Sequence, residues 1–186
     1  TTKDVVVGVS PIFITPGDLD GNQTVDLVTT NFESNNLTVL SGSGDGTFGP
    51  LNTYPAGKGT HWIASGDFNL DGNIDLVTAN IDATNISSLS GNGDGSFKLP
   101  EIYEIQATVH AVTPGDLNND GVLDLVTANI SSNTITLLHG KGDGAFSIRD
   151  EYFVGPSPHL VRINDLNNDG INDLVIFKFT LHVLIR

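Results

Sequence analysis

The 186-residue chain contains no cysteine and no methionine, and 22 acidic residues outnumber 8 basic ones. Without cysteine there is no disulfide framework, no thiolate metal site and no cysteine nucleophile. The net charge of −14 argues against nucleic-acid binding and against an anionic membrane surface, because both depend on lysine and arginine. No apolar run is long enough to span a bilayer, so no membrane insertion is expected. With 38% hydrophobic and 16% charged residues, the composition is that of a globular protein.

The sequence is rich in internal repetition. Four acidic segments align without a gap, and the first aspartate of the second lies 49 residues after that of the first (67 − 18 = 49). The same spacing leads on to Asp116 and Asp165. A glycine-rich motif, read as LSGSGDGTF, LSGNGDGSF and LHGKGDGAF, keeps this period, as does a column formed by Tyr54, Tyr103 and Tyr152. A repeat of this length indicates an array, a propeller or a solenoid.

Each repeat is predicted to form four short strands. In the second repeat, a strand over 61–66 leads into the acidic segment and a second strand follows at 75–79. A third strand leads into the Gly-Asp-Gly turn, which is a strong hairpin signal, and a fourth follows it. No segment has helical periodicity. We expect an all-β fold, a β-propeller of four-stranded antiparallel blades, as one domain over 1–186 with repeats 10–58, 59–107, 108–156 and 157–186 plus 1–9.

The two chain ends predict how such a propeller closes. Residues 4–8 align with the end of a fourth strand, at 53–57, whereas residues 180–186 align with a third strand. We therefore expect a four-bladed propeller in which the N-terminal strand completes the last blade and removes an exposed sheet edge. The alternative is a fragment of a larger propeller, whose open edges would pair between chains.

The acidic segments have the pattern of cation-binding loops. Each offers oxygens at its first, third, fifth and ninth positions, and Ca²⁺ takes several oxygen ligands at short distance. The expected side-chain ligands are Asp18, Asp20, Asn22 and Asp26; Asp67, Asn69, Asp71 and Asp75; Asp116, Asn118, Asp120 and Asp124; and Asp165, Asn167, Asp169 and Asp173. Backbone carbonyls at the seventh position would add Thr24, Asn73, Val122 and Ile171.

A simpler explanation for these loops is that they form Asx-turns, which need no metal. Repulsion among the converging carboxylates argues for a cation, and up to four Ca²⁺ ions are expected. A glycine at the sixth position, Gly72 in the second loop, permits the sharp reversal of the chain. The first loop has Gln23 there and its glycine two positions earlier, at Gly21, so this loop is expected to be strained or to bind more weakly.

The acidic loops together with the LxGxGDGxF hairpins resemble the FG-GAP repeats of integrin α-chain propellers and, more closely, the related VCBS repeats of extracellular proteins. The resemblance covers nearly the whole chain. It implies a β-propeller with Ca²⁺ in the loop between the first and second strands of each blade, held by the residues named above. It also implies an extracellular role in adhesion, glycan binding or scaffolding. Propellers of this family usually have seven blades, whereas this chain has four repeats.

Ligand-binding residues are harder to identify from the sequence. His61, His110 and His159 form a column that could contact a ligand, but the first repeat has Ile12 there, which favours packing between blades. Trp62 could stack on a sugar if it is exposed and otherwise belongs to the core. Asn31, Asn80 and Asn129 either end the second strands through side-chain hydrogen bonds or line one face as a polar ring.

No set of residues indicates catalysis, so the chain is not expected to be an enzyme. We expect a secreted, calcium-stabilised binding module that acts as a lectin or adhesin. The alternatives are a protein-adhesion or scaffold module resembling the integrin head, and an accessory domain of a larger secreted enzyme. The expected partner is a glycan or an extracellular protein, with self-association as a further possibility.

Overall fold

The computed structural model describes residues 4–178 and 181–184, which form fifteen strands and no helix. All strand pairs are antiparallel and each sheet follows the order of the chain. The first sheet contains β1 (Pro11–Gly17), β2 (Asp26–Asn31), β3 (Asn36–Gly42) and β4 (Phe48–Pro55). The second contains β5 (Thr60–Gly66), β6 (Asp75–Asn80), β7 (Asn85–Leu89) and β8 (Glu101–Glu104). The third contains β9 (Val109–Gly115), β10 (Asp124–Asn129), β11 (Thr134–Gly140) and β12 (Phe146–Phe153). The fourth contains β13 (Leu160–Asn164), β14 (Asp173–Phe177) and β15 (Leu181–Leu184).

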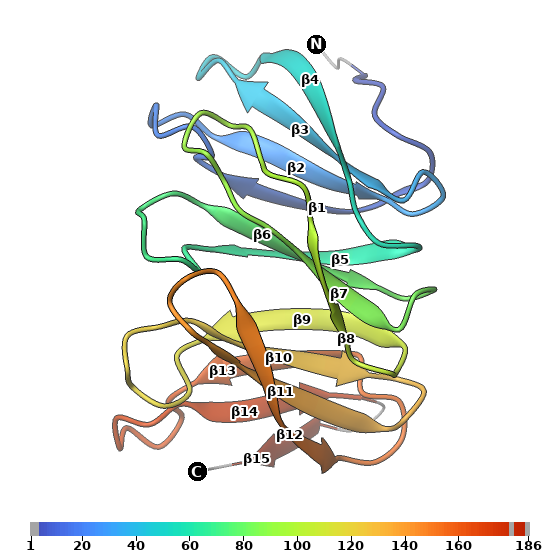
Figure 1. Ribbon diagram of the computed structural model, residues 1–186, viewed down its shortest axis with the longest axis vertical. Coiled ribbons are helices and arrows are strands. Elements are labelled where there is room, and N and C mark those ends of the chain that lie inside the picture. Colours follow the sequence, from blue (N-terminus) through green and yellow to red (C-terminus); the bar gives the residue numbers. More distant parts are fainter. Residues whose placement is uncertain (1–3, 179–180, 185–186) are drawn as a thin grey trace.

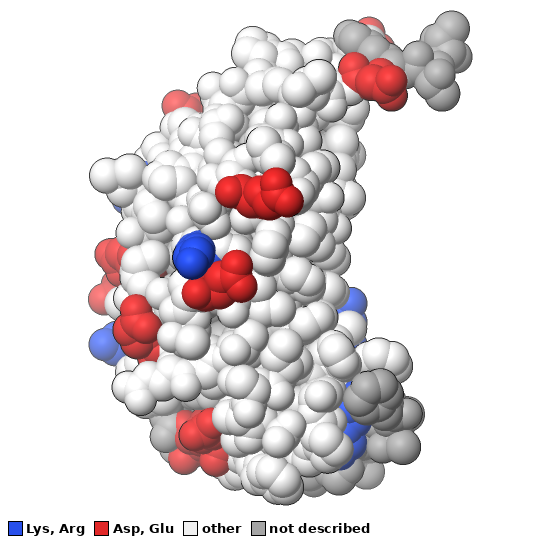
Figure 2. Space-filling view, turned by 90° about the vertical axis from the view of Figure 1, so that its right-hand side faces the viewer, with Lys and Arg blue, Asp and Glu red and all other residues white. Residues whose placement is uncertain are grey.

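The four sheets, or blades, are stacked in chain order, with the termini at opposite ends of the stack (Figure 1). The first strands lie side by side, because β1 contacts β5, β5 contacts β9, and β9 contacts β13. The outline is curved and hollowed on one side (Figure 2). The described residues therefore form an open arc of propeller-like blades, as the repeat pattern predicted for each blade.

The expected closure of four blades into a ring is not what the structure shows. Among the described residues the fourth sheet has three strands and receives no N-terminal strand. Val5 and Val7 instead lie against the first blade, beside Ile14 and Leu27. The physical reason is distance, since the first and last blades lie at opposite ends of the curved stack (Figure 1).

The hydrophobic core lies between successive sheets, in three layers. Between the first two blades, Val28 and Val39 pack against Leu76 and Leu89 of the second, and all are buried. The other two layers repeat this arrangement between the second and third and between the third and fourth blades. Each such side chain contributes about 1.5–3 kcal/mol when it is fully buried. A blade is thus stable only because its neighbours cover its faces.

The second strand of each complete blade is buried on both faces, although its sequence, DLVTAN in β6, mixes apolar and polar residues. Its polar residues satisfy one another. Asn80 is fully buried, and its Nδ2 donates to Asn85 Oδ1 at 2.9 Å and to Ser87 Oγ at 2.8 Å. Thr78 Oγ1 donates to Asn80 Oδ1 at 3.0 Å. The same buried network surrounds Asn31 and Asn129, so these asparagines end strands and do not form a polar ring on a surface.

Two members of the histidine column, His61 and His110, occupy β-bulges in the first strands of their blades, and His159 directly precedes β13. The register between β5 and β6 shifts between Thr60 and Trp62, which leaves His61 as the extra residue, and His110 has the same place in β9. A bulged residue leaves the hydrogen-bond ladder and can turn its groups towards a neighbour. His61 Nδ1 lies 3.2 Å from the carbonyl oxygen of His110, and His110 Nδ1 lies 2.8 Å from that of His159. Because a carbonyl only accepts, both Nδ1 atoms carry the proton and donate from one blade to the next.

Protonation of His110 should weaken the joint between blades. Burial lowers the pKa of its imidazole below the usual 6.5, with help from the neighbouring His61 and His159 rings, although the bond to His159 opposes the shift. The unfolded chain therefore binds the proton more tightly, and the free energy of unfolding should fall as the pH drops below about 6.5. His110→Asn keeps a donor for the His159 carbonyl and removes the titration. Urea unfolding between pH 7.5 and 5 should show a smaller loss of stability for this variant than for the unaltered protein. An equal loss in the two proteins would contradict the prediction.

Candidate metal centre

The four acidic loops connect the first and second strands of each blade and lie along one edge of the stack, on the left in Figure 1. The strands place the ninth-position aspartates at the start of β2, β6, β10 and β14. In the first three blades the hairpin between the third and fourth strands lies beside the loop, since Gly44 lies against Thr24, Gly93 against Asn73 and Gly142 against Val122. The repeat pattern thus brings chemically similar sites to the same edge.

The aspartate at the ninth position anchors each loop in the blade. Asp75 is buried, and its two oxygens accept the N–H groups of Phe68 at 3.0 Å and Gly91 at 2.8 Å. Burial raises the pKa of Asp75, and those two hydrogen bonds only partly oppose the rise. The equivalent aspartates accept from the second residue of their own loops, Leu19, Leu117 and Leu166. A negative charge held inside the fold in this way is stabilised further by any nearby positive charge.

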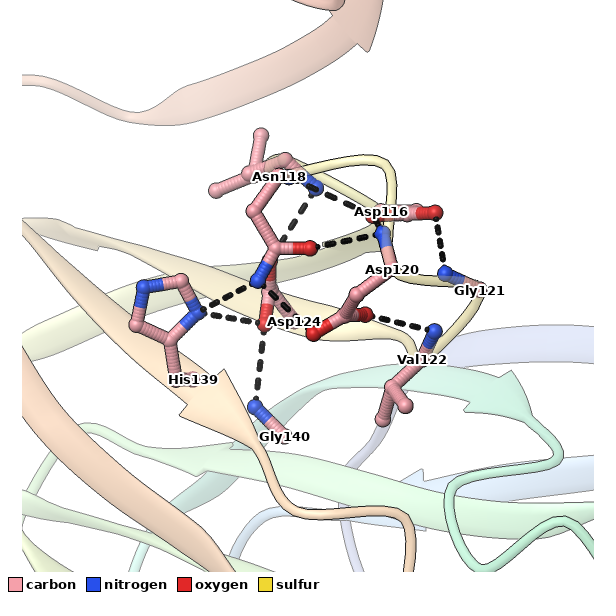
Figure 3. Close-up of polar contacts among 9 residues, drawn as sticks. Asp116, Asn118, Asp120, Gly121, Val122, Asp124, His139 and Gly140 are labelled. Atoms are coloured by element: carbon pink, nitrogen blue, oxygen red, sulfur yellow. Dashed lines mark hydrogen bonds and ion pairs between the residues drawn. The ribbon is translucent and has the colours of Figure 1, made fainter.

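The aspartate at the first position accepts backbone N–H groups across the loop. Asp116 Oδ2 accepts from Gly121 at 2.9 Å, and Asp116 Oδ1 accepts from Asn118 at 3.2 Å (Figure 3). Partial burial opposes ionisation of Asp116, but these backbone hydrogen bonds outweigh it and lower its pKa. The loop therefore holds this carboxylate in its charged form.

The third and fifth positions form Asx-turns, as the metal-free explanation predicted. In the third loop Asn118 Oδ1 accepts the N–H of Asp120 at 2.9 Å, and Asp120 Oδ1 accepts that of Val122 at 2.8 Å (Figure 3). Asn118 Nδ2 donates to Asp120 Oδ2 at 2.9 Å. Carboxylate and amide oxygens keep further acceptor capacity after one hydrogen bond, so these contacts do not exclude a cation.

Two positions in every loop require the left-handed backbone region. The sixth position is Gly72, Gly121 or Gly170 in three loops, at φ of 83–86°. The fourth position is also left-handed, with φ of 73° at Gly21 and 59° at Leu70. The first loop therefore has its glycine at the fourth position, and Gln23 occupies the sixth position at φ 66°. Sequence reasoning missed the fourth position, although the asparagines Asn119 and Asn168 there were a signal, because asparagine tolerates this region.

The first loop has the tightest cluster of acidic oxygens. Among the residues that the structure describes, Asp18, Asp20 and Asp26 are the one acidic group whose ligand atoms all lie within 4.8 Å of one another. Asp18 Oδ1 is buried and has no hydrogen-bond partner. An orphaned buried carboxylate oxygen beside two others fits a cation of the Ca²⁺ type. The geometry therefore makes the first loop the best candidate for a cation site, although the sequence predicted weaker binding there.

The residues that surround the third loop differ from those around the other loops. Its neighbour is His139, in a column that holds Ser41 and Ser90 in the earlier blades. His139 Nδ1 lies 2.8 Å from Asp124 Oδ1, as Figure 3 shows. A cavity of about 560 Å³ opens beside it, lined by Asn118, Tyr152 and Ile171 among others. In the first and second blades, a phenylalanine of the following blade packs against the tyrosine that corresponds to Tyr152. Phe97 packs edge-on to Tyr54, and Phe146 packs edge-on to Tyr103.

The same repeats are found by comparison with known families. The sequence matches the FG-GAP-like repeat family in three overlapping stretches, 18–78, 67–127 and 116–176. The chain belongs to the FG-GAP-like repeat family. The match confirms the resemblance to FG-GAP repeats that the loops and hairpins indicated. No curated protein sequence matches the chain.

Solved structures resemble this FG-GAP-like chain in fold. Two crystal structures of BBS1N in complex with ARL6DN, soaked with lead and with mercury, match with TM-scores of 0.64 and 0.63 at 16% and 14% identity. They cover 92% and 97% of this chain and 52% and 59% of the BBS1N chain. The Photorhabdus luminescens Tc holotoxin pore matches with a TM-score of 0.55 and 18% identity, over 91% of this chain and 9% of that one. This chain therefore spans between half and three fifths of the BBS1N chains, and the likeness is one of fold.

The FG-GAP-like loops also join neighbouring blades. The N–H of Gly95, in the second blade's hairpin, donates to the carbonyl of Leu19 in the first loop at 3.2 Å. Gly144 makes the same contact with Phe68 at 3.1 Å. Between the third and fourth loops, Asn119 Nδ2 donates to the Gly170 carbonyl and Asn172 Nδ2 to that of Asp116, both at 2.8 Å. A charge bound in one loop thus acts on two blades.

The candidate ligand residues lie in or directly before the first strands of the FG-GAP-like blades, which are β5, β9 and β13. The histidine column makes the contacts between blades described above, with ring centroids 4.6 and 4.7 Å apart. Trp62 is half-buried and stacks on Phe13, with ring centroids 4.1 Å apart. Both rings line a groove of about 260 Å³ together with Thr15, Thr113 and Arg162. Within the described residues, no helix is long and apolar enough to cross a membrane.

Leu70→Asn should stabilise the protein. Leu70 is exposed at φ 59°, where a branched apolar side chain is strained and asparagine is tolerated. We expect the free energy of unfolding to rise by about 1 kcal/mol. Equilibrium urea unfolding measures the change, and Leu99→Asn is the matched control because Leu99 is also exposed but lacks a positive φ. Equal effects of the two substitutions would count against strain at the fourth position.

Proposed function

We propose that this repeat-based binding or scaffold module is stabilised by Ca²⁺ in its acidic loops and works outside the cell. The observation that carries the proposal is the first loop, where one oxygen from each of three aspartates lies within 4.8 Å of the others and Asp18 Oδ1 is buried without a hydrogen-bond partner. All expected donors are oxygens, which suit a hard cation, and no nitrogen or sulfur ligand belongs to the set.

In the first loop Asp18, Asp20, Asn22 and Asp26 would hold the ion, with the carbonyl of Thr24. The corresponding residues of the other loops would hold up to three more. The bound ion would supply positive charge to carboxylates that otherwise repel one another. The protein's own hydrogen bonds connect the loop to its blade and to the next blade. Asp26 fixes the loop to its blade through the N–H groups of Leu19 and Gly42, and Leu19 in turn accepts from the next blade.

The metal sites are proposed to be structural. The loops repeat in every blade and act as joints between blades, which is what a stabilising site requires. Ca²⁺ sites of extracellular modules bind with dissociation constants of roughly 10⁻⁴–10⁻³ M, so they fill outside cells and stay largely empty in a cytosol. A site outside the cell is therefore the setting in which Ca²⁺ sites of this affinity would stabilise the protein.

The groove on the inner strands is the proposed ligand site, and a glycan is the ligand that its chemistry fits. The Phe13–Trp62 pair offers an aromatic surface on which a sugar ring can stack. Thr15 and the exposed Arg162 supply hydrogen-bonding groups around it. Its volume of about 260 Å³ suits a small unit of a larger chain.

A protein partner is the second candidate. BBS1N, which matches this chain in fold, was crystallised in complex with ARL6DN. The likeness is one of fold, so it supports a protein-binding role by analogy only. The two candidates differ in whether a purified glycan is sufficient for binding.

Ca²⁺ should raise the melting temperature in a way that depends on the first loop. At a Ca²⁺ concentration of 100 times the dissociation constant, each site adds about 2.7 kcal/mol, because the ion binds the folded state alone. For a chain of this size that corresponds to roughly 5–10 °C per site. Asp18→Asn should reduce the shift between Ca²⁺ and chelator, and calorimetric titration should count one site fewer.

Asp45→Asn is the control for this experiment. Asp45 lies in a Gly-Asp-Gly turn, where it accepts bonds from Thr47 at 2.6 and 2.9 Å, and it is not an expected ligand. Its variant should keep the full response to Ca²⁺. Identical melting curves of the unaltered protein in Ca²⁺ and in chelator would overturn the proposal.

Arg162→Ala should weaken glycan binding about tenfold without unfolding the protein, because Arg162 is exposed and loses a charged hydrogen bond worth about 1.5–3 kcal/mol. A glycan array selects the ligand and calorimetry measures its affinity. Lys58→Ala, an exposed charge outside the groove, should leave binding unchanged. An array on which the unaltered protein binds no glycan would overturn the glycan candidate and favour a protein partner.

A further inference from the structure

Arg162 breaks the repeat of the first strands at one position. Steps of 49 residues back from Arg162 lead to Thr113, Ala64 and Thr15. The structure confirms this column, because each of the four residues pairs with a valine in the second strand of its own blade. Three blades therefore have a short side chain here, and one has a long cationic side chain. Arg162 is exposed, so packing does not require the change.

The first strands contain almost no charge, although the protein is strongly acidic. Within the described strands β1, β5, β9 and β13 there is no aspartate, glutamate or lysine, and Arg162 is their one permanently charged residue. The groove on these strands has no acidic residue in its lining either. Along the hollowed margin in Figure 2, blue atoms are present and red ones appear only at the upper end. The groove is therefore a positively charged site on an acidic protein.

The guanidinium group of Arg162 has no partner within the fold. It makes no hydrogen bond or ion pair with another described residue. Arginine presents its N–H donors in a planar fork, which fits the paired oxygens of an anionic group. An unpaired surface arginine is common by itself. Here it borders an aromatic groove and lies in a column of short residues, which together indicate a ligand.

The groove has an aromatic end and a cationic end. Phe13 on β1 and Trp62 on β5 stack on each other, and Arg162 lies on β13. Between them the groove crosses β9 at Thr113, whose hydroxyl donates to the carbonyl of Val161 at 2.7 Å and so joins β9 to β13. Neighbouring strands are at least about 4.7 Å apart, so β5 and β13 are separated by at least about 9 Å. This separation favours a ligand of two or more sugar units.

We propose that the groove binds an acidic oligosaccharide, in which one sugar stacks on the Phe13–Trp62 pair and the carboxylate or sulfate of a neighbouring sugar binds Arg162. The inference rests on the proposed glycan site and specifies the class of glycan. Thr15 and Ser65 also line the groove and supply hydroxyl groups for the sugar. Charge complementarity selects this ligand, because a neutral sugar would leave Arg162 without a counter-charge and a cationic ligand would be repelled.

The net charge of the protein makes the contribution of Arg162 specific. At −14 the protein repels anions over most of its surface, and salt screens this repulsion beyond about 8 Å. An acidic glycan is therefore attracted only where a local cation outweighs the general repulsion. We expect one binding site for an acidic glycan, and a single substitution should remove its preference for the charged form.

A glycan array with matched pairs tests the requirement for charge. Oligomers of galacturonic, mannuronic and glucuronic acid and of sulfated galactose are each printed beside their carboxyl-reduced or desulfated counterparts. We expect the charged member of a pair to bind at least tenfold more tightly, and the pairs that respond distinguish a carboxylate from a sulfate. Equal binding of charged and neutral members would overturn the inference and leave the glycan proposal intact. An array without any binding would overturn both.

Variants assign the preference to Arg162. In calorimetric titrations with the best pair, Arg162→Ala should lower the affinity for the charged member at least tenfold, to that of the neutral member. Arg162→Lys keeps the charge without the planar fork and should retain part of the preference. Equal loss of both members in Arg162→Ala would show a contact with the neutral part of the sugar and would overturn the inference.

Two further variants complete the experiment. Trp62→Ala should weaken the charged and the neutral members alike, because it removes the stacking surface that both of them use. Lys58→Ala is the matched control, since Lys58 is exposed and lies outside the groove, and it should keep both affinities. Circular dichroism identifies variants that fail to fold. A loss of the preference for charge in Lys58→Ala would show that general electrostatics, and not Arg162, select the ligand.

Discussion

The packing of one blade on the next is the interaction on which the rest of the structure depends. A four-stranded sheet of this size cannot bury either face alone, and the buried residues gather in three layers, each between two sheets. The histidine bulges and the acidic loops add hydrogen bonds across the same boundaries. Stability is thus a property of pairs of blades, which is the behaviour of repeat proteins in general.

The strong acidity has a local origin in this architecture. Twelve of the 22 acidic residues are the aspartates of the four loops, and the fold holds them at one edge. The ninth-position aspartates are buried and satisfied by backbone N–H groups, while the first-position aspartates accept backbone N–H groups across the loop. The charge is therefore concentrated at the joints between blades, where a cation would have the largest effect on stability.

The repeats, the four strands of each complete blade and the Gly-Asp-Gly hairpins were predictable from the sequence, because alternation and turn chemistry are local. The closure of four blades was predicted wrongly. The alignment of residues 4–8 with the end of a fourth strand was sound, since Gly8 packs on Asn31 as Gly57 packs on Asn80, but alignment does not tell which sheet lies within reach. The burial of Asn80 and its partners was one of two explanations left open, and the contacts decided between them.

The sequence by itself determined the elements and the donor chemistry, because a period of 49 residues, oxygen ligands at alternate loop positions and glycine at left-handed positions are all written locally. The tertiary structure decided what depends on neighbours far away in the chain. It exposed Ile14 while burying Ile63, and it joined His61 to His110. Corresponding positions of the repeats have different environments there, because each blade's surroundings are set by the blades before and after it.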